Sequence, residues 1–246
     1  MTIAQDSEIL GAANSAAGNY DTAITPASTP AAVCVIIIDD TSAADVVTSV
    51  TYGISAGAVI LTRRRFDTEA TEPGGVYIYW AAGTFPAGAQ TVRITRTGTD
   101  NIRAAIFTMT AGAGMTVSVD TDATGTSAST ANPSWAMATA ATATACYLGI
   151  HSGLNAMTST PAAGWTLAPS PGFEDIGNQG RGWARQLMTS AGAAAPGWAA
   201  ATADDFVGAS IAFKEIPVPL AGLVSPAIAG RPVNPGREAP AILSGN

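Results

Sequence analysis

The sequence predicts an all-β protein built as an antiparallel β-sandwich, and three observations support that prediction. Short runs suited to strands recur at roughly 8–12-residue spacing, separated by Gly, Pro, Asp, Asn or Ser. Alanine is abundant but is interleaved with Thr, Ser and Gly, so no helical stripe of apolar residues develops. The chain of 246 residues is long enough to bury the core of a single large β domain.

Two of the runs show how their strands should be buried. Residues 33–39 (VCVIIID) are almost continuously apolar, which predicts a strand covered on both faces. Residues 75–81 (GVYIYWA) place Val76, Ile78 and Trp80 on one face and two tyrosines on the other. We expect Trp80 to belong to the core.

The other candidate strands are shorter or less regular. They are residues 46–53, 58–64 and 90–97, followed by IRAAIFTMT, MTVSVD, SWAMATAA, TACYLGIHS, GWTLAP, GRGWARQLMTS and FVGASIAFK, the last at 206–214.

The composition divides the chain into three parts. Residues 1–30 are small and polar and should form an extended lead-in or an edge segment, whereas residues 31–216 should form the sandwich. Residues 217–246 hold six of the fifteen prolines, so we expect an extended C-terminal arm. A simple spacer would be rich in Gly, Ser or charge. The arm instead has apolar and basic residues that could contact another subunit, and a frayed tail without a partner remains the alternative. The candidate contact residues are Leu220, Leu223, Val224, Ile228, Arg231, Val233 and Arg237.

Charge and hydropathy exclude two classes of partner. The net charge is −7 and Lys214 is the only lysine, which argues against nucleic acid. No apolar stretch approaches the roughly 20 residues that cross a bilayer, and the first residues do not resemble a signal peptide. We therefore expect a soluble protein made in the cytoplasm, with no membrane partner. Cys34 and Cys146 lie in apolar runs, which favours buried thiols over a disulfide.

The motifs that could support catalysis or metal binding are weak. The match of GISAG (53–57) to a nucleophile elbow lacks the helix that should follow, so a hairpin loop explains it better. His151 is the only histidine and should lie on the surface or in a loop. Paired carboxylates such as Asp39–Asp40 suit turns and lack the spacing of a calcium loop. The prediction is a protein without enzymatic activity and without a cofactor or metal.

Two groups remain as candidate interaction residues. Arg63, Arg64 and Arg65 form the only basic run, and alternation would put Arg63 and Arg65 on one face and Arg64 on the other. We expect this run to meet acidic neighbours. Trp165 and Trp198 follow glycines in loop-like contexts, and exposed tryptophans there would suit sugar stacking.

The order of the runs resembles a known group of proteins. The segments VTSVTYGISAGAVILTRR, GVYIYWAAGTFPAGAQTVRIT, AAGWTLAP and DDFVGASIAFK look like a jelly-roll-type β-sandwich of virion structural proteins from tailed bacteriophages, over about residues 31–214. The resemblance implies a capsid decoration or cement protein on the virion surface. Its partners would be the major capsid protein or other virion subunits, and it would form a homo-oligomer such as a trimer. The alternatives are a tail or spike component and a carbohydrate-binding module for host-surface glycans.

Overall fold

The computed structural model describes residues 3–41, 44–54, 57–68, 73–140, 144–153, 157–175, 179–200 and 202–218. Every regular element in these residues is a β-strand, and all strand pairs are antiparallel. The prediction of an all-β, antiparallel sandwich is therefore confirmed.

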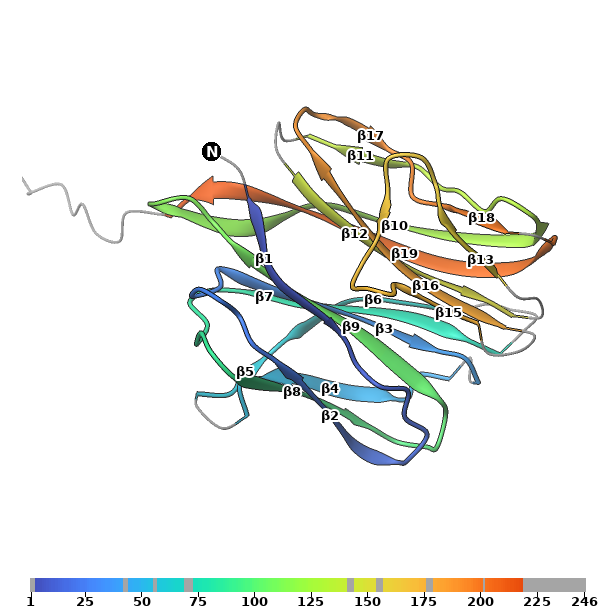
Figure 1. Ribbon diagram of the computed structural model, residues 1–246, viewed down its shortest axis with the longest axis horizontal. Coiled ribbons are helices and arrows are strands. Elements are labelled where there is room, and N and C mark those ends of the chain that lie inside the picture. Colours follow the sequence, from blue (N-terminus) through green and yellow to red (C-terminus); the bar gives the residue numbers. More distant parts are fainter. Residues whose placement is uncertain are drawn as a thin grey trace, which may run out of the picture.

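The strands lie in four stacked layers (Figure 1). The first outer layer is one sheet of β2 (Gly18–Ile24), β8 (Gln90–Arg96), β4 (Val47–Tyr52) and β5 (Val59–Ile60). The first inner sheet contains β1 (Ala4–Leu10), β9 (Ile102–Thr110), β3 (Ala32–Asp39), β7 (Gly75–Ala82) and β6 (Thr62–Thr68).

The other two layers come from the rest of the chain. The second inner sheet contains β10 (Met115–Thr130), β19 (Asp204–Pro217), β12 (Thr144–Ser152), β16 (Gly180–Met188) and β14 (Thr166–Leu167), with β15 (Phe173–Asp175) also on β16. The second outer layer consists of two ribbons, β11 (Met137–Thr139) with β17 (Gly192–Ala194) and β13 (Met157–Pro161) with β18 (Trp198–Ala200).

The first two layers form a jelly roll. Its strands pair from the outside inward along the sequence, β1 with β9, β2 with β8, β3 with β7 and β4 with β5. This nested pairing divides eight strands between two sheets, and β6 extends one sheet beside β7. The first jelly roll thus spans residues 4–110. The predicted boundary at residue 30 falls inside it, because β1 and β2 supply its first strand pairs.

The last two layers repeat most of this pattern. In the second half, β10 pairs with β19, β11 with β17 and β12 with β16, which gives three nested pairs as in the first half. β13 pairs with β18, a pair that crosses β12–β16 and corresponds to the pairing of β4 with β8. The order of the strands is the same in both inner sheets. The strands β1, β9, β3, β7 and β6 of the first half correspond in turn to β10, β19, β12, β16 and β14 of the second. The chain is a tandem of two jelly rolls, and their inner sheets pack face to face.

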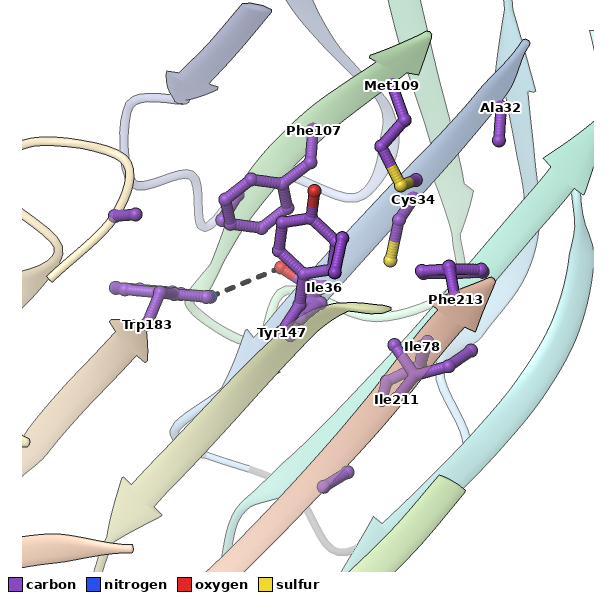
Figure 2. Packing of buried hydrophobic residues seen from close by; sticks show 14 of the residues in the cluster. Ala32, Cys34, Ile36, Ile78, Phe107, Met109, Tyr147, Trp183, Ile211 and Phe213 are labelled. Carbon is purple, nitrogen blue, oxygen red and sulfur yellow. Dashed lines mark hydrogen bonds between the residues drawn. The ribbon is translucent and has the colours of Figure 1, made fainter. Parts of the chain in front are cut away.

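A shared core joins the two halves. Phe107 of the first half packs on Tyr147 of the second with ring centroids 4.4 Å apart, and Tyr147 also contacts Phe213 (Figure 2). The indole N–H of Trp183 donates to the carbonyl oxygen of Ile36 across the seam at 3.2 Å. Both residues are fully buried, and a buried N–H or carbonyl group without a hydrogen-bond partner is costly. This hydrogen bond satisfies both groups.

Strand β3 confirms the interpretation of the run VCVIIID. Its even-numbered residues, including Ile36, face the seam, and its odd-numbered residues, including Ile37, face the core of the first jelly roll. All eight residues of β3 are buried. The same explanation applies to β12, which lies in the middle of the second inner sheet and is buried along its whole length.

Small residues allow the layers to approach closely. A Cβ at Gly149 would lie 2.5 Å from Cγ2 of Ile36 in the opposite sheet. On the other face of the second inner sheet, Trp135 lies over the paired glycines Gly125 and Gly208 and donates to the hydroxyl of Ser210 at 2.9 Å. Larger side chains at these glycines would push the layers apart.

Candidate interaction site

The basic run lies on β6, the edge strand of the first inner sheet. Arg63 pairs with Asp45 at 2.5 Å, and both side chains are about two-fifths exposed, at 42% and 41%. Arg64 and Arg65 both bind Asp122, with Nε to carboxylate distances of 2.7 and 2.6 Å. The acidic neighbours that the sequence predicts are therefore present, and they lie within the same chain.

The predicted alternation of the three arginines is wrong. A β-bulge between Arg63 and Arg65 shifts the register of β6 on β7, so Arg64 and Arg65 reach the same carboxylate. A bulge and a run of charge are the devices by which natural edge strands avoid pairing with other sheets. We therefore interpret the TRRRF run as edge protection and as a link between the halves.

The link is reciprocal. Asp122 lies on β10, the first strand of the second half, whereas Glu8 lies on β1, the first strand of the first half. Glu8 pairs with Arg185 of β16 at 3.4 Å, and the hydroxyl of Tyr147 donates to Gln5 beside it at 2.6 Å. Side chains of each half thus bind the first strand of the other half. These pairs are partly exposed, so each should contribute less than about 1 kcal/mol.

The other end of the seam holds a buried charge cluster. Arg181 is fully buried and pairs with Asp40 of the first half at 3.1 Å and with Glu174 at 3.3 Å. Arg103 of the first half completes the cluster with a 3.1 Å contact to Glu174. Burial raises the pKa of the nearby Asp39 carboxyl to about 6, although hydrogen bonds from Thr41 oppose this. This cluster is the most charged part of the core.

His151 lies beside this cluster, contrary to the predicted surface or loop position. It is fully buried on β12, in register with Arg181, and a Cβ at Gly74 would lie 2.3 Å from its Nδ1. Neither ring nitrogen has a hydrogen-bond partner in the part of the chain that the structure describes. Burial, reinforced by the charge of Arg181, lowers the pKa of His151 to about 3. The imidazole is therefore neutral at ordinary pH.

Trp165 and Trp198 are buried, with 6% and 2% of their surfaces exposed. The indole N–H of Trp165 donates to the carbonyl oxygen of Ala195 at 3.1 Å, and that of Trp198 to Thr158 at 2.5 Å. Both tryptophans fix the outer ribbons of the second half from beneath. They do not form the exposed groove that sugar stacking would need.

Three surface hollows each contain an exposed aliphatic side chain. One, of about 470 Å³, lies beside Ile60, which is 72% exposed. A second, of about 300 Å³, lies beside Leu187, which is 50% exposed, and a third, of about 390 Å³, lies beside Val218, which is 49% exposed. We name them the Ile60, Leu187 and Val218 hollows. The sequence does not single out Ile60, because it lies in the apolar run AVIL at residues 58–61.

The remaining predicted contact residues lie outside the described residues, since the last of these is Val218. They are Leu220, Leu223, Val224, Ile228, Arg231, Val233 and Arg237. The chain approaches this segment along β19, where the Val218 N–H donates to the carbonyl oxygen of Gly114 at 2.9 Å.

The described residues contain no candidate metal site, no disulfide and no membrane-spanning helix. No group of three or more His, Cys, Asp or Glu side chains among them is placed to hold a metal ion. Their only cysteines, Cys34 and Cys146, are free and buried. In this same part of the chain, no helix is long and apolar enough to span a membrane. The full sequence matches no protein-family model and no curated protein.

Proposed function

We propose that this chain is a non-enzymatic structural protein of a bacteriophage virion, namely a decoration or cement protein that binds the major capsid protein at the virion surface. The observation that supports this proposal best is the tandem jelly roll, because jelly rolls recur in viral capsid proteins. A large part of the chain serves to hold the two jelly rolls together. That construction suits a rigid block that adds contact area to a lattice.

The charges and bulges on two edge strands agree with such a role. β6 carries three arginines and a bulge, and β1 carries Asp6, Glu8 and a bulge between Gln5 and Ser7. Protected edges prevent open-ended growth of the sheets into neighbouring molecules. A decoration protein needs this protection because it is concentrated on a surface beside many copies of itself.

The experiment that tests the function uses virions assembled without this chain. Purified chain is added, and the particles are sedimented and then heated. We expect the chain to sediment with the particles in a fixed number of copies and to raise the temperature at which they release DNA. Absence of the chain from the sedimented particles at saturating concentration would refute the proposal.

The oligomeric state is measured on the same preparation. We expect sedimentation equilibrium of the chain alone to give a homo-oligomer, with a trimer as the proposed form. A monomer would remove the oligomer from the proposal and leave the particle-binding role to be judged by the sedimentation of particles.

A further inference from the structure

The Val218 hollow lies at one end of the seam and is lined by both jelly rolls. The first half contributes residues 29–31 and 83–84, and the second half contributes residues 115–116 and Val218. Strand β3 runs from this hollow to the buried charge cluster, because the residue before it lines the hollow and the residue after it, Asp40, belongs to the cluster. A segment that fills the hollow would therefore contact both halves at the end opposite the charge cluster.

The cover of the first inner sheet thins along β7 toward this hollow. The strand is buried as far as Tyr79, half-buried at Trp80 and exposed at Ala82, the last residue before the hollow. Trp80 packs against the shared core and lies on Phe213, with ring centroids 5.6 Å apart. Among the described residues, the lining of the hollow has no charged side chain, and its volume of about 390 Å³ is in the range of pockets that hold a small ligand. The hollow is thus an uncharged opening beside the shared core, with room for apolar side chains.

The chain itself continues from this hollow. The Val218 N–H donates to the carbonyl oxygen of Gly114 at 2.9 Å, which fixes the backbone there, and the Val218 side chain is 49% exposed. Val218 stands between Pro217 and Pro219, and a proline holds the residue before it in an extended conformation. Leu220 is only two residues further on, so its Cα lies within about 7 Å of that of Val218. Covalent connection alone therefore brings a leucine to the hollow.

We propose that residues 219–224, the first part of the C-terminal arm, dock in the Val218 hollow of their own chain and close this end of the seam. Leu220 lies on the same face of the extended chain as Val218 and enters the hollow, where it contacts both halves. This segment has an advantage over that of a second copy, because a short connection gives it an effective concentration in the millimolar range. The two prolines reduce the conformational entropy that is lost on docking. The clasp forms in the free chain, so it goes beyond the proposed function, and it leaves residues 225–246 to contact a partner.

The test compares the full chain with the variants Leu220→Asp and Leu243→Asp by thermal unfolding. Both positions follow the last described strand, so the sandwich should fold in both variants. Because burial of a leucine side chain is stabilising, we expect Leu220→Asp to lower the midpoint of unfolding by roughly 3–12 °C. Leu243→Asp is the matched control and should leave the midpoint unchanged. A midpoint for Leu220→Asp equal to that of the wild type would overturn the proposal.

A double-mutant cycle tests whether Leu220 occupies this particular hollow. Thr84 is an exposed residue of its lining, and Thr84→Asp places a charge against the docked leucine. If both substitutions disrupt the same contact, the double variant should lose less stability than the sum of the two single variants. Thr48→Asp, at an exposed residue in the Ile60 hollow, is the control and should be additive with Leu220→Asp. Additive losses in the Thr84 cycle would overturn docking in the Val218 hollow.

Protein concentration separates the two sources from which the segment could come. When a chain's own segment fills its hollow, the difference in midpoint between the wild type and Leu220→Asp should be the same at low and high protein concentration. A difference that grows with concentration would show that the arm of a second copy occupies the hollow, and would overturn the proposal. None of these measurements involves virions, so their outcomes leave the proposed function to its own test.

Discussion

The two jelly rolls have the same inner sheet but different outer layers. In the first half, the outer layer is one sheet of four strands, and the core beneath it is built from Val, Ile and Tyr side chains. In the second half, the outer layer is divided into two ribbons, and the core beneath holds Trp165, Trp198, two buried methionines and small residues. The shared seam requires matching surfaces from both inner sheets, whereas an outer layer only has to cover its own core. The comparison shows that a jelly roll tolerates a broken outer sheet when tryptophans fill the space beneath it.

The largest effect should come from removing one of those tryptophans. Trp198→Ala deletes a fully buried ring and its hydrogen bond to Thr158, so it should lower the free energy of unfolding by about 3–5 kcal/mol. Urea unfolding followed by circular dichroism measures the change. Trp198→Phe is the matched control and should recover part of the loss. A cost below about 1 kcal/mol for Trp198→Ala would show that the ribbons do not depend on this side chain.

A second pair of substitutions compares the seam with the core of the first jelly roll. Ile36→Ala and Ile37→Ala remove the same side chain from neighbouring positions of β3 that face different cores. Because both are fully buried, each should cost about 2–5 kcal/mol, and unfolding should stay a single transition in both variants. A much smaller cost for Ile36→Ala, or separate transitions for the two halves, would mean that the halves are only loosely joined.

The third prediction compares a buried ion pair of the seam with an exposed ion pair inside the first jelly roll. Asp40→Ala leaves the buried guanidinium of Arg181 with Glu174 as its remaining carboxylate, and should cost about 3 kcal/mol. Arg63→Gln removes an exposed pair and should cost less than about 1 kcal/mol. Denaturant titrations of both variants give the comparison directly. Equal costs would show that burial does not govern these pairs.

A further prediction concerns the dependence of stability on pH. His151 has a pKa of about 3 in the folded protein, compared with about 6.5 when unfolded, so the unfolded chain binds a proton first as the pH falls below 6.5. His151 should therefore reduce the free energy of unfolding by up to about 1.4 kcal/mol for each pH unit between 6.5 and 3. His151→Gln should remove this slope, whatever its effect on absolute stability.

Asp39 provides the opposing control. Its pKa of about 6 is above the ordinary value of 3.8, so the folded protein binds the proton first and gains stability as the pH falls from 6 to about 4. Asp39→Asn should therefore make the acid-side loss steeper, whereas His151→Gln makes it shallower. Unfolding curves measured between pH 4 and 7 separate the two. Identical slopes in both variants and the wild type would contradict the prediction.

The sequence predicts the strands best where burial alone determines the pattern of apolar residues. The apolar run at 33–39 and the alternation at 75–81 are both confirmed, because Val76 and Ile78 face the seam while Tyr77 and Tyr79 face the first core. The duplication is not visible in the sequence, because the halves share an order of strand pairing rather than a pattern of residues. Pairing partners lie up to about a hundred residues apart, and local periodicity carries no information about them.

The errors at individual residues have physical causes. Alternation fails at Arg63–Arg65 because a bulge adds a residue to the strand. Trp165 and Trp198 follow glycines and so resemble loop residues, yet the adjacent ribbons bury them. His151 is buried because β12 lies in the middle of a sheet that is itself covered on both faces. Each error depends on a neighbour from a distant part of the chain.

The stacking of four layers sets different limits on sequence change at different depths. Adjacent residues of β3 and β12 belong to different cores, so a substitution that enlarges one residue disturbs one packing arrangement and a shift of register disturbs two. The outer layers have one covered face, and their other face is open to variation. Over evolution, the outer layers should therefore diverge first while the two inner sheets change slowly. For engineering, foreign segments should be tolerated in the turns of the outer layers and rejected in the inner sheets.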